Sequence, residues 1–472
     1  MDTLAYTPAW RLVELIRHRQ LSPVELIEHL MQRTERLNPR LNAYLTVAHE
    51  QALSAARAAE SALDQGGELS SLHGVPVSIK DLIWTGGLRT TGGSLIYQDF
   101  EPEEDATVVE RLRRAGAIIL GKTNTPELGL SATTENRLGD DCRNPWNPEC
   151  TSGGSSGGAA AAVAAGLGPI AIGSDGGGSI RMPAGFCGVF GFKPTYGLVP
   201  RYGGVGGMEL FSAIGPITRS VRDAALCLNV ISGHDPRDPA SLRQRPPDFV
   251  ASTEGDVAGL RVAWSPDLGY GKVDPEVQAV AESAAYLFEA MGCFVEEAMP
   301  ATVEPFPIHN LITLADECAA NGHLVEEHGD IMMPHVKSVM EHGRKVTGAE
   351  YSRALRALER FKLQTAEFFE RYDLLLTPTT AVPAFPIGKW PRTIAGAEVG
   401  RLWGSFPFAP AFNLTGQPAA SLPCGFSADG LPIGLQAVAR WGEDVTLLRA
   451  CAAFERGRPW ADKVPPLDDL AT

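Results

Sequence analysis

The sequence lacks the signals of membrane-spanning and secreted proteins. No apolar run approaches the roughly 18 residues of a spanning helix, and no basic segment with an apolar stretch behind it stands near Met1. The 8 cysteines form no CxxC pair and show no disulfide-rich spacing. We therefore predict a cytoplasmic protein with buried, reduced thiols.

Positive charge and metal-binding patterns are also scarce. There are 41 Lys and Arg against 56 Asp and Glu, a net charge of −15, whereas phosphate binding needs clustered basic residues. Neither HExxH nor its inverse occurs, and His323 and His328 are five residues apart, which fits one helical face poorly. The histidines and acids at 323–335 are therefore predicted to lie on a solvated helix face. We expect no nucleic-acid partner, no metal and no cofactor.

Helical and strand-like segments alternate along the chain. Ser22, followed by Pro23 and Glu25, is typical of a helix start. Residues 8–65 show helical spacing of apolar and charged positions, and 52–63 is predicted to be helical throughout. Further helices are predicted at 107–115, 157–165, 274–291 and much of 301–370, and strands at 117–120, 169–174, 259–264, 293–295, 374–378 and 420–423. The alternation predicts an α/β protein with a sheet between helices. No linker or repeat interrupts it, so we expect one large domain.

Two glycine-rich segments each contain a serine. They are GGSSGG at 153–158, which holds Ser155, and DGGGSIR at 175–181, which holds Ser179. Glycine runs cost conformational entropy, and they favour a backbone that approaches a ligand or turns N–H groups toward a negative charge. The N–H groups expected to converge on one oxyanion belong to Gly176, Gly177, Gly178 and Ser179. The two segments predict hydrolysis by a serine nucleophile.

Lys80 is a candidate base for this serine. It ends an apolar segment, and desolvation can lower a lysine pKa from its usual value of about 10.4. Ser155 could then pass a proton between Ser179 and Lys80, because a hydroxyl both accepts and donates. In the alternative interpretation both glycine runs are structural turns and Lys80 is an ordinary surface lysine.

Two other patterns match known motifs by chance. Residues 116–123 (GAIILGKT) fit the P-loop pattern, but the residues between the glycines are those of a buried strand, and Pro126 interrupts any helix after it. Residues 153–157 (GGSSG) fit the nucleophile-elbow pattern, but we expect no strand before them.

The chain resembles the amidase signature family over about residues 5–230 and 370–455. Besides 153–158 and 175–181, the motifs that carry the resemblance are GVPVSIKD (74–81), GKTNTPE (121–127), RNPWNP (143–148), FCG (186–188), GFKPTYG (191–197), NLTG (413–416) and GLPIGLQ (430–436). Two positions depart from the family pattern: Gly176 replaces a larger residue, and Ser152 stands where a proline is common.

The resemblance implies a Ser-cisSer-Lys triad. Ser179 corresponds to the nucleophile, Ser155 to the bridging serine after a cis peptide bond, and Lys80 to the base; Asp175 and Arg181 would brace the nucleophile loop. The implied fold is a single α/β/α layered domain with a mixed, twisted central sheet. Its catalytic core would span about 65–230, a variable pocket or cap region about 300–412, and a C-terminal segment, 413–460, would rejoin the core.

The resemblance leaves two kinds of activity. Proteins similar to the A subunit of glutamyl-tRNA amidotransferase place an aspartate seven residues before the Asn of the NLTG-like motif, where this chain has Phe406. A phenylalanine cannot hold the ammonium group of glutamine. We therefore favour a free-standing hydrolase of apolar or aryl amides, carbamates (urethanes) or esters, similar to aryl acylamidases and urethanases. A glutaminase-type component of a larger amidotransferase complex is the alternative.

The same region supplies candidate pocket residues. Phe406, Trp403, Phe408 and Met332 are expected to line an apolar pocket for a small-molecule substrate. Alternatively, these aromatic residues pack in the core. A homodimer is left open, and no membrane partner is expected.

Overall fold

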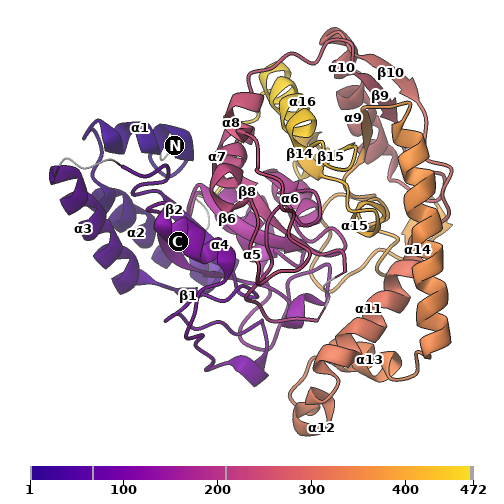
Figure 1. Cartoon of the computed structure of the whole chain (residues 1–472), viewed down its shortest axis with the longest axis horizontal. Coiled ribbons are helices and arrows are strands. Elements are labelled where there is room, and N and C mark those ends of the chain that lie inside the picture. The colour runs from indigo at the N-terminus through magenta and orange to yellow at the C-terminus, as the bar shows by residue number, and fades with distance from the viewer. Residues whose placement is uncertain (1–2, 66–68, 208–209, 468–472) are drawn as a thin grey trace.

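A mixed sheet of 11 strands forms the centre of the structure, a computed structural model that describes residues 3–65, 69–207 and 210–467 (Figure 1). In order across the sheet the strands are β1 (Tyr44–Val47), β3 (Ile118–Thr123), β2 (Pro76–Lys80), β6 (Ile170–Asp175), β8 (Ala213–Thr218), β7 (Phe190–Lys193), β14 (Ala419–Phe426), β15 (Pro432–Ala439), β11 (Leu374–Pro378), β9 (Arg261–Trp264) and β10 (Phe294–Glu297). The pairs β2–β3, β2–β6, β9–β10 and β9–β11 are parallel, and the other neighbours are antiparallel.

Helices cover the sheet on both sides (Figure 1). They are α1 (Ala9–Arg17), α2 (Pro23–Leu41), α3 (His49–Asp64), α4 (Thr107–Arg114), α5 (Gly157–Ala164), α6 (Arg181–Cys187), α7 (Val221–Ile231), α8 (Phe249–Ser252), α9 (Pro275–Ala285), α10 (Leu287–Ala290), α11 (Phe306–Asn321), α12 (Leu324–His328), α13 (Pro334–Gly343), α14 (Gly348–Phe369), α15 (Pro410–Leu414) and α16 (Asp444–Gly457). Short 3-10 helices lie at Leu95–Tyr97 and Glu127–Gly129. Helices α11 to α14 form one side of the molecule, which we call the cap (Figure 1).

Strand side chains alternate between two helical layers, as the two-residue period of a strand requires. In β3, Ile118 and Leu120 belong to the core shared with α2, α3 and α5, whereas Ile119 belongs to the core shared with α4 and α7. In β6, Ala171 and Ile172 are divided between the two cores in the same way. The predicted α/β fold with a sheet between helices is confirmed.

Most predicted elements are present. Helix α2 begins at Pro23, and the Ser22 hydroxyl accepts the N–H groups of Val24 and Glu25. Within the P-loop-like residues 116–123, residues 118–123 form the strand β3, and Lys122 Nζ is fully buried 4.0 Å from Asp81 Oδ1.

Two predictions are wrong. A strand does precede the first glycine segment: β5 (Asn147–Thr151) pairs with β4 (Arg143–Asn144) in a small sheet of its own, separate from the central sheet. Residues 8–65, predicted from helical spacing, also contain β1, which is too short to show a period of its own.

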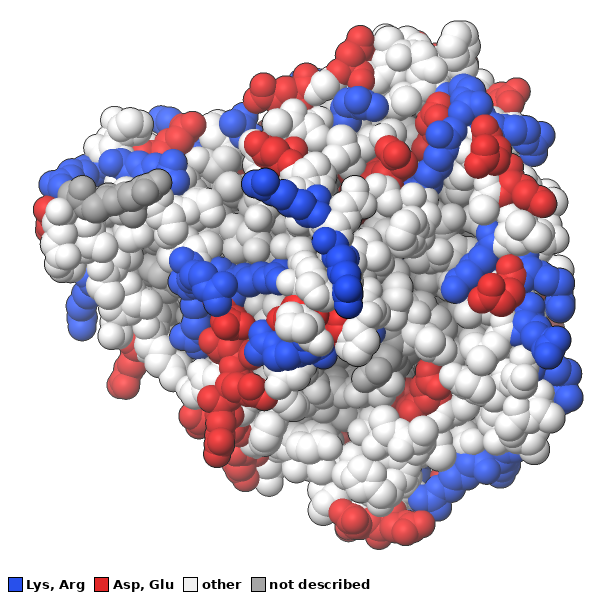
Figure 2. Space-filling view, in the orientation of Figure 1, with Lys and Arg blue, Asp and Glu red and all other residues white. Residues whose placement is uncertain are grey.

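The cysteines, the surface charges and the helices all bear on the predictions made from composition. All 8 cysteines are free thiols, and all but Cys318 are buried. Acidic and basic side chains are mixed over the face seen in Figure 2. Among the described residues, no helix has the length and apolar character to cross a membrane.

Helix α5 lies unusually close to the neighbouring backbone because its residues are small. All of its residues are buried. A Cβ atom at Gly158 would stand 2.3 Å from the backbone nitrogen of Asn124 and 2.4 Å from the carbonyl oxygen of Ala43. This glycine is therefore required by contact with the protein's own backbone.

We expect Gly158→Ala to lower the free energy of unfolding by about 3 kcal/mol or more, because neither backbone can yield without shifting a strand or a loop. Urea denaturation followed by circular dichroism measures the change. The matched control is Gly348→Ala at the start of α14, where the new Cβ would meet no atom within 4 Å beyond its chain neighbours and the backbone of its own helix. Equal effects of the two substitutions would contradict the close contact.

Candidate active site

Lys80 ends the buried strand β2 and carries its amine into the interior. Its side chain is fully buried, and Nζ donates to Ser155 Oγ at 2.7 Å and to Ser174 Oγ at 3.0 Å. Burial lowers the pKa of Lys80 to about 7, against the opposing attraction of Asp175. This lysine can therefore be neutral, and so act as a base, near neutral pH.

Ser155 stands between β5 and α5, where the first glycine segment turns into the helix. The peptide bond between Gly154 and Ser155 is cis, as the resemblance implies. The next residue joins the two glycine segments, because Ser156 N donates to the carbonyl oxygen of Ser179 at 3.0 Å. Ser155 and Ser179 line the same cavity, but no hydrogen bond connects their hydroxyls in the described part of the chain.

The loop that is predicted to carry the nucleophile, called the nucleophile loop below, follows β6 and wraps around the carboxylate of Asp175. Asp175 accepts the N–H groups of Gly178 at 2.7 Å and Ile180 at 3.1 Å. Gly178 has φ +119°, and a Cβ there would stand 2.5 Å from the Cβ of Ala409, so glycine is needed on both grounds. These contacts fix the backbone on both sides of Ser179.

A fully buried polar cluster stands behind this loop. Arg181 pairs with Asp175 at 2.9 Å and donates to Asn413 Oδ1 at 2.6 Å and to Gln436 Oε1 at 2.7 Å. With the carbonyl of Ala409 as a further acceptor, every nitrogen of its guanidinium donates a hydrogen bond. Burial alone would raise the pKa of Asp175, but Arg181 holds it well below its usual range. Asp175 and Arg181 do brace the loop, together with residues of the two C-terminal motifs.

The predicted oxyanion donors need one correction. The N–H of Gly178 already donates to Asp175, so it does not face an incoming substrate. The N–H groups of Gly176, Gly177 and Ser179 have no acceptor among the described residues. These three remain as candidates.

Ser174 is a polar neighbour of the lysine that sequence reasoning missed. It lies on β6 beside β2, lines the cavity, and accepts from Lys80 through its hydroxyl. Its backbone carbonyl accepts from the Ser156 hydroxyl at 3.2 Å. Its position in the sequence could have indicated a place near the site, since Ser174 directly precedes the Asp of the second glycine segment.

The cap reaches the nucleophile loop through His309 of α11. His309 Nε2 lies 3.0 Å from the carbonyl oxygen of Gly176, and burial lowers the pKa of His309, which favours the neutral imidazole. Trp403 packs edge-on against His309 at 5.2 Å and comes within 3.4 Å of the position of a Cβ at Gly177. No local sequence pattern indicated His309.

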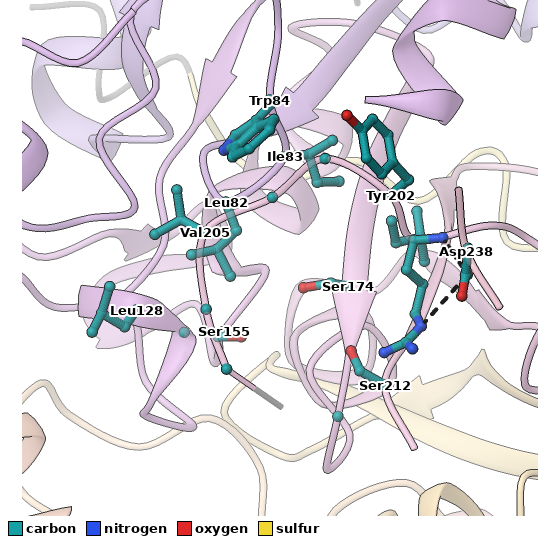
Figure 3. A pocket seen from close by; sticks show the side chains of 18 of the residues that line it. Leu82, Ile83, Trp84, Leu128, Ser155, Ser174, Tyr202, Val205, Ser212 and Asp238 are labelled. Atoms are coloured by element: carbon teal, nitrogen blue, oxygen red, sulfur yellow. Dashed lines mark hydrogen bonds and ion pairs between the residues drawn. The ribbon is translucent and has the colours of Figure 1, made fainter. Parts of the chain in front are cut away.

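A cavity of about 420 Å³ opens beside the serines. In Figure 3, Leu82, Trp84, Val205 and Leu128 lie on one side, with Ser155 near them, Tyr202, Ser212 and Asp238 lie on the other side, and Ser174 lies between the two groups. Glu317 of α11 also lines it, so the predicted cap region does contribute to the wall. The remaining charged lining residues are Glu104, Arg201 and Arg237.

The structure corrects the predicted pocket residues. Phe406 and Phe408 are fully buried, and Phe406 packs against Phe186 with ring centroids 5.5 Å apart. Met332 is buried among side chains of α12 and α13. Neither these three residues nor Trp403 line the cavity at the serines. The alternative interpretation, core packing, therefore describes Phe406 and Phe408.

The acidic and His-rich segment at 323–335 spans α12 and the start of α13. His328 lies 3.9 Å from Glu327, and both side chains are exposed. Within the described ranges, no group of three or more His, Cys, Asp or Glu is arranged to hold a metal ion.

Comparison with known proteins identifies relatives of the whole chain. The model of the family described as Amidase matches residues 25–448. The chain is 40% identical to an acylamidase of Rhodococcus erythropolis, over 98% of both chains. It is also 40% identical to the A subunit of the glutamyl-tRNA(Gln) amidotransferase of Moorella thermoacetica, over 98% of this chain and 99% of that protein. The crystal structure of a bacterial aryl acylamidase of the amidase signature family superposes with a TM-score of 0.91 at 31% identity, covering 98% of both chains.

Replacing Arg181 with methionine should strongly destabilise the fold. Methionine keeps an aliphatic stem but leaves Asp175 as an unpaired buried charge, so we expect the free energy of unfolding to fall by about 3–5 kcal/mol. Arg11→Met is the matched control, because Arg11 pairs with Glu14 at 2.7 Å on the surface and such pairs contribute at most about 1 kcal/mol. Urea denaturation measures both, and a small loss at Arg181 would show that the cluster is dispensable.

Proposed function

The chain belongs to the amidase signature family of amide hydrolases, and from this premise we propose that Ser179 is its nucleophile, Ser155 the proton relay and Lys80 the base, acting on apolar and aryl amides. The observation that carries the proposal is the 2.7 Å contact between Lys80 Nζ and Ser155 Oγ in a fully buried setting. A lysine with a pKa of about 7 is matched to proton transfer at neutral pH.

The proposed reaction begins with neutral Lys80. It accepts the proton of Ser155 while Ser155 accepts that of Ser179, whose Oγ attacks the carbonyl carbon of the amide. The relay then reverses: Lys80 returns its proton through Ser155 to the leaving nitrogen, and the C–N bond breaks. Water attacks the resulting acyl-enzyme on Ser179 and releases the acid.

Oxyanion stabilisation is proposed for the backbone N–H groups of Gly176, Gly177 and Ser179. Donors fixed in place before the reaction stabilise the developing charge without reorganising, and they supply much of the rate enhancement in acyl transfer. The supporting features are the absence of competing acceptors among the described residues and the bracing of the loop by Asp175 and Arg181.

The substrate class follows from the apolar side of the cavity. Leu82, Trp84 and Leu128 offer an apolar surface to an aryl or alkyl group, and the volume of about 420 Å³ suits a small molecule. Carbamates and esters pass through the same tetrahedral intermediate, so a urethanase activity is part of the proposal.

A glutaminase-type role within an amidotransferase complex is the second candidate, since the amidotransferase relative is as similar as the acylamidase. Phe406, which stands where that family is expected to place an ammonium-binding aspartate, is buried in an aromatic cluster and offers no carboxylate to the cavity. The free-standing hydrolase is therefore the better-supported function.

Ser179→Ala and Lys80→Ala should each lower kcat/KM on 4-nitroacetanilide at least ~10⁴-fold, since a triad acts as a unit. The assay uses the purified chain alone, and circular dichroism verifies the fold. Ser212→Ala is the matched control, a serine in the same cavity outside the lysine contact. Full activity of either triad variant would overturn the catalytic roles. A wild-type chain that is inactive alone but cleaves glutamine when amidotransferase partners are added would favour the second candidate.

The rate should depend on pH through Lys80. The base must be deprotonated, so kcat/KM rises as pH increases through its pKa of about 7, whereas an ordinary lysine would place this limb near 10. The neutral substrate 4-nitroacetanilide does not titrate in this range. Burial also raises the pKa of Glu455 to about 7, so Glu455→Gln is the control. This variant should retain the rise of kcat/KM with pH near pH 7. A flat profile between pH 5 and 9 would contradict the role of Lys80, whatever the outcome for Ser179.

A further inference from the structure

Arg201 lines the active-site cavity from the loop that follows β7. Its side chain is only 13% exposed, and its guanidinium lies over the ring of Tyr196 at 5.2 Å. The guanidinium of Arg201 is therefore held in place at the cavity wall, unlike that of a mobile arginine on the surface.

The hydrogen-bonding capacity of this guanidinium is almost entirely unused. Nε is buried without an acceptor, and the only hydrogen bond that the group makes within the described residues is a long one of 3.4 Å from Nη2 to the Tyr196 hydroxyl. Asp238 stands 4.0 Å from Nε, too far for a hydrogen bond, and its oxygens already accept the backbone N–H groups of Arg201 and Ala240. The charge of Arg201 is thus balanced, but its donors are not satisfied.

The other charged groups of the cavity are engaged. Arg237 donates to Asp235 at 2.7 Å and to Glu110 at 2.8 Å. Glu104 accepts from the Tyr202 hydroxyl at 2.8 Å. Glu317 accepts from Asn321 at 3.1 Å and from the backbone of Gly207 at 3.4 Å. Of the two arginines in this wall, Arg201 is the one whose guanidinium has no carboxylate within hydrogen-bond distance.

We propose that Arg201 is a subsite for a carboxylate carried by the substrate. The inference rests on the proposed amide hydrolysis and narrows its substrate class to amides that bear an apolar group and a carboxylate. The apolar group would lie against Leu82, Leu128 and Val205, on the side of the cavity opposite Asp238 (Figure 3). A guanidinium can bind a carboxylate through two parallel hydrogen bonds, which is stronger and more directional than a neutral contact.

Two matched pairs of amides test the subsite and show which part of the substrate carries the carboxylate. 4-Acetamidobenzoate is compared with 4-nitroacetanilide, in which a neutral nitro group has the shape of the carboxylate. Glutaryl 4-nitroanilide is compared with pentanoyl 4-nitroanilide. In wild-type protein we expect a lower KM for the carboxylate member of at least one pair. Arg201→Met should raise that KM about 10- to 100-fold and change its neutral partner much less.

Two further variants separate recognition from a structural role. Arg201→Lys keeps the charge but loses the planar fork, so the preference should be partly retained. Arg237→Met removes the same charge from the same cavity, but Arg237 is already paired with Asp235 and Glu110, so the ratio between the paired KM values should not change. Equal losses on both members of a pair, or an equal shift in Arg237→Met, would overturn the subsite.

Binding to the inactive Ser179→Ala protein supplies a readout that does not depend on turnover. Calorimetric titration with 4-acetamidobenzoate and with 4-nitroacetanilide should show tighter binding of the carboxylate, and Arg201→Met in that background should abolish the difference. Equal affinities for the two compounds would overturn the subsite. Cleavage of the neutral amides by wild-type protein would leave the proposed hydrolase intact even then.

Discussion

The ion pair between Arg181 and Asp175, 2.9 Å apart and fully buried, holds the active site in its geometry. Moving two charges out of water costs several kcal/mol per ion, and pairing offsets this only when the remaining donors and acceptors are also satisfied. Asn413 and Gln436 accept further hydrogen bonds from Arg181, although they lie 232 and 255 positions from it in the sequence. The loop of Ser179 therefore depends on contacts from both ends of the motif-bearing core.

Two buried lysines, Lys122 and Lys80, differ in whether a carboxylate lies within ion-pair distance of the amine. Lys122 lies 4.0 Å from Asp81 and donates to Thr90 at 2.8 Å, and burial lowers its pKa to about 8. Lys80 has serine hydroxyls as its nearest partners, and burial lowers its pKa to about 7. A carboxylate neighbour stabilises a cation, whereas hydroxyl neighbours can also bond to the neutral amine.

The motifs predicted where the functional loops lie, but they did not predict which residues line the pocket. Lys80, Ser155 and Ser179 lie in segments whose glycine content and apolar context are visible locally. Phe406 shows the limit, because whether an aromatic residue faces a core or a cavity depends on what packs against it from distant elements. Arg201 and His309 gave no local signal for the same reason: each matters through a contact with another part of the chain.

The hydrogen bond between His309 and the carbonyl of Gly176 has a consequence beyond packing. That carbonyl and the N–H of Gly177 belong to one planar trans peptide unit, in which the two bonds point in opposite directions. By holding the oxygen toward α11, His309 turns the N–H of Gly177 away from the cap. The orientation of a backbone donor in the nucleophile loop is thus set by a side chain from the cap, which lies outside the motif-bearing core. Divergence of the cap can alter reactivity as well as substrate choice.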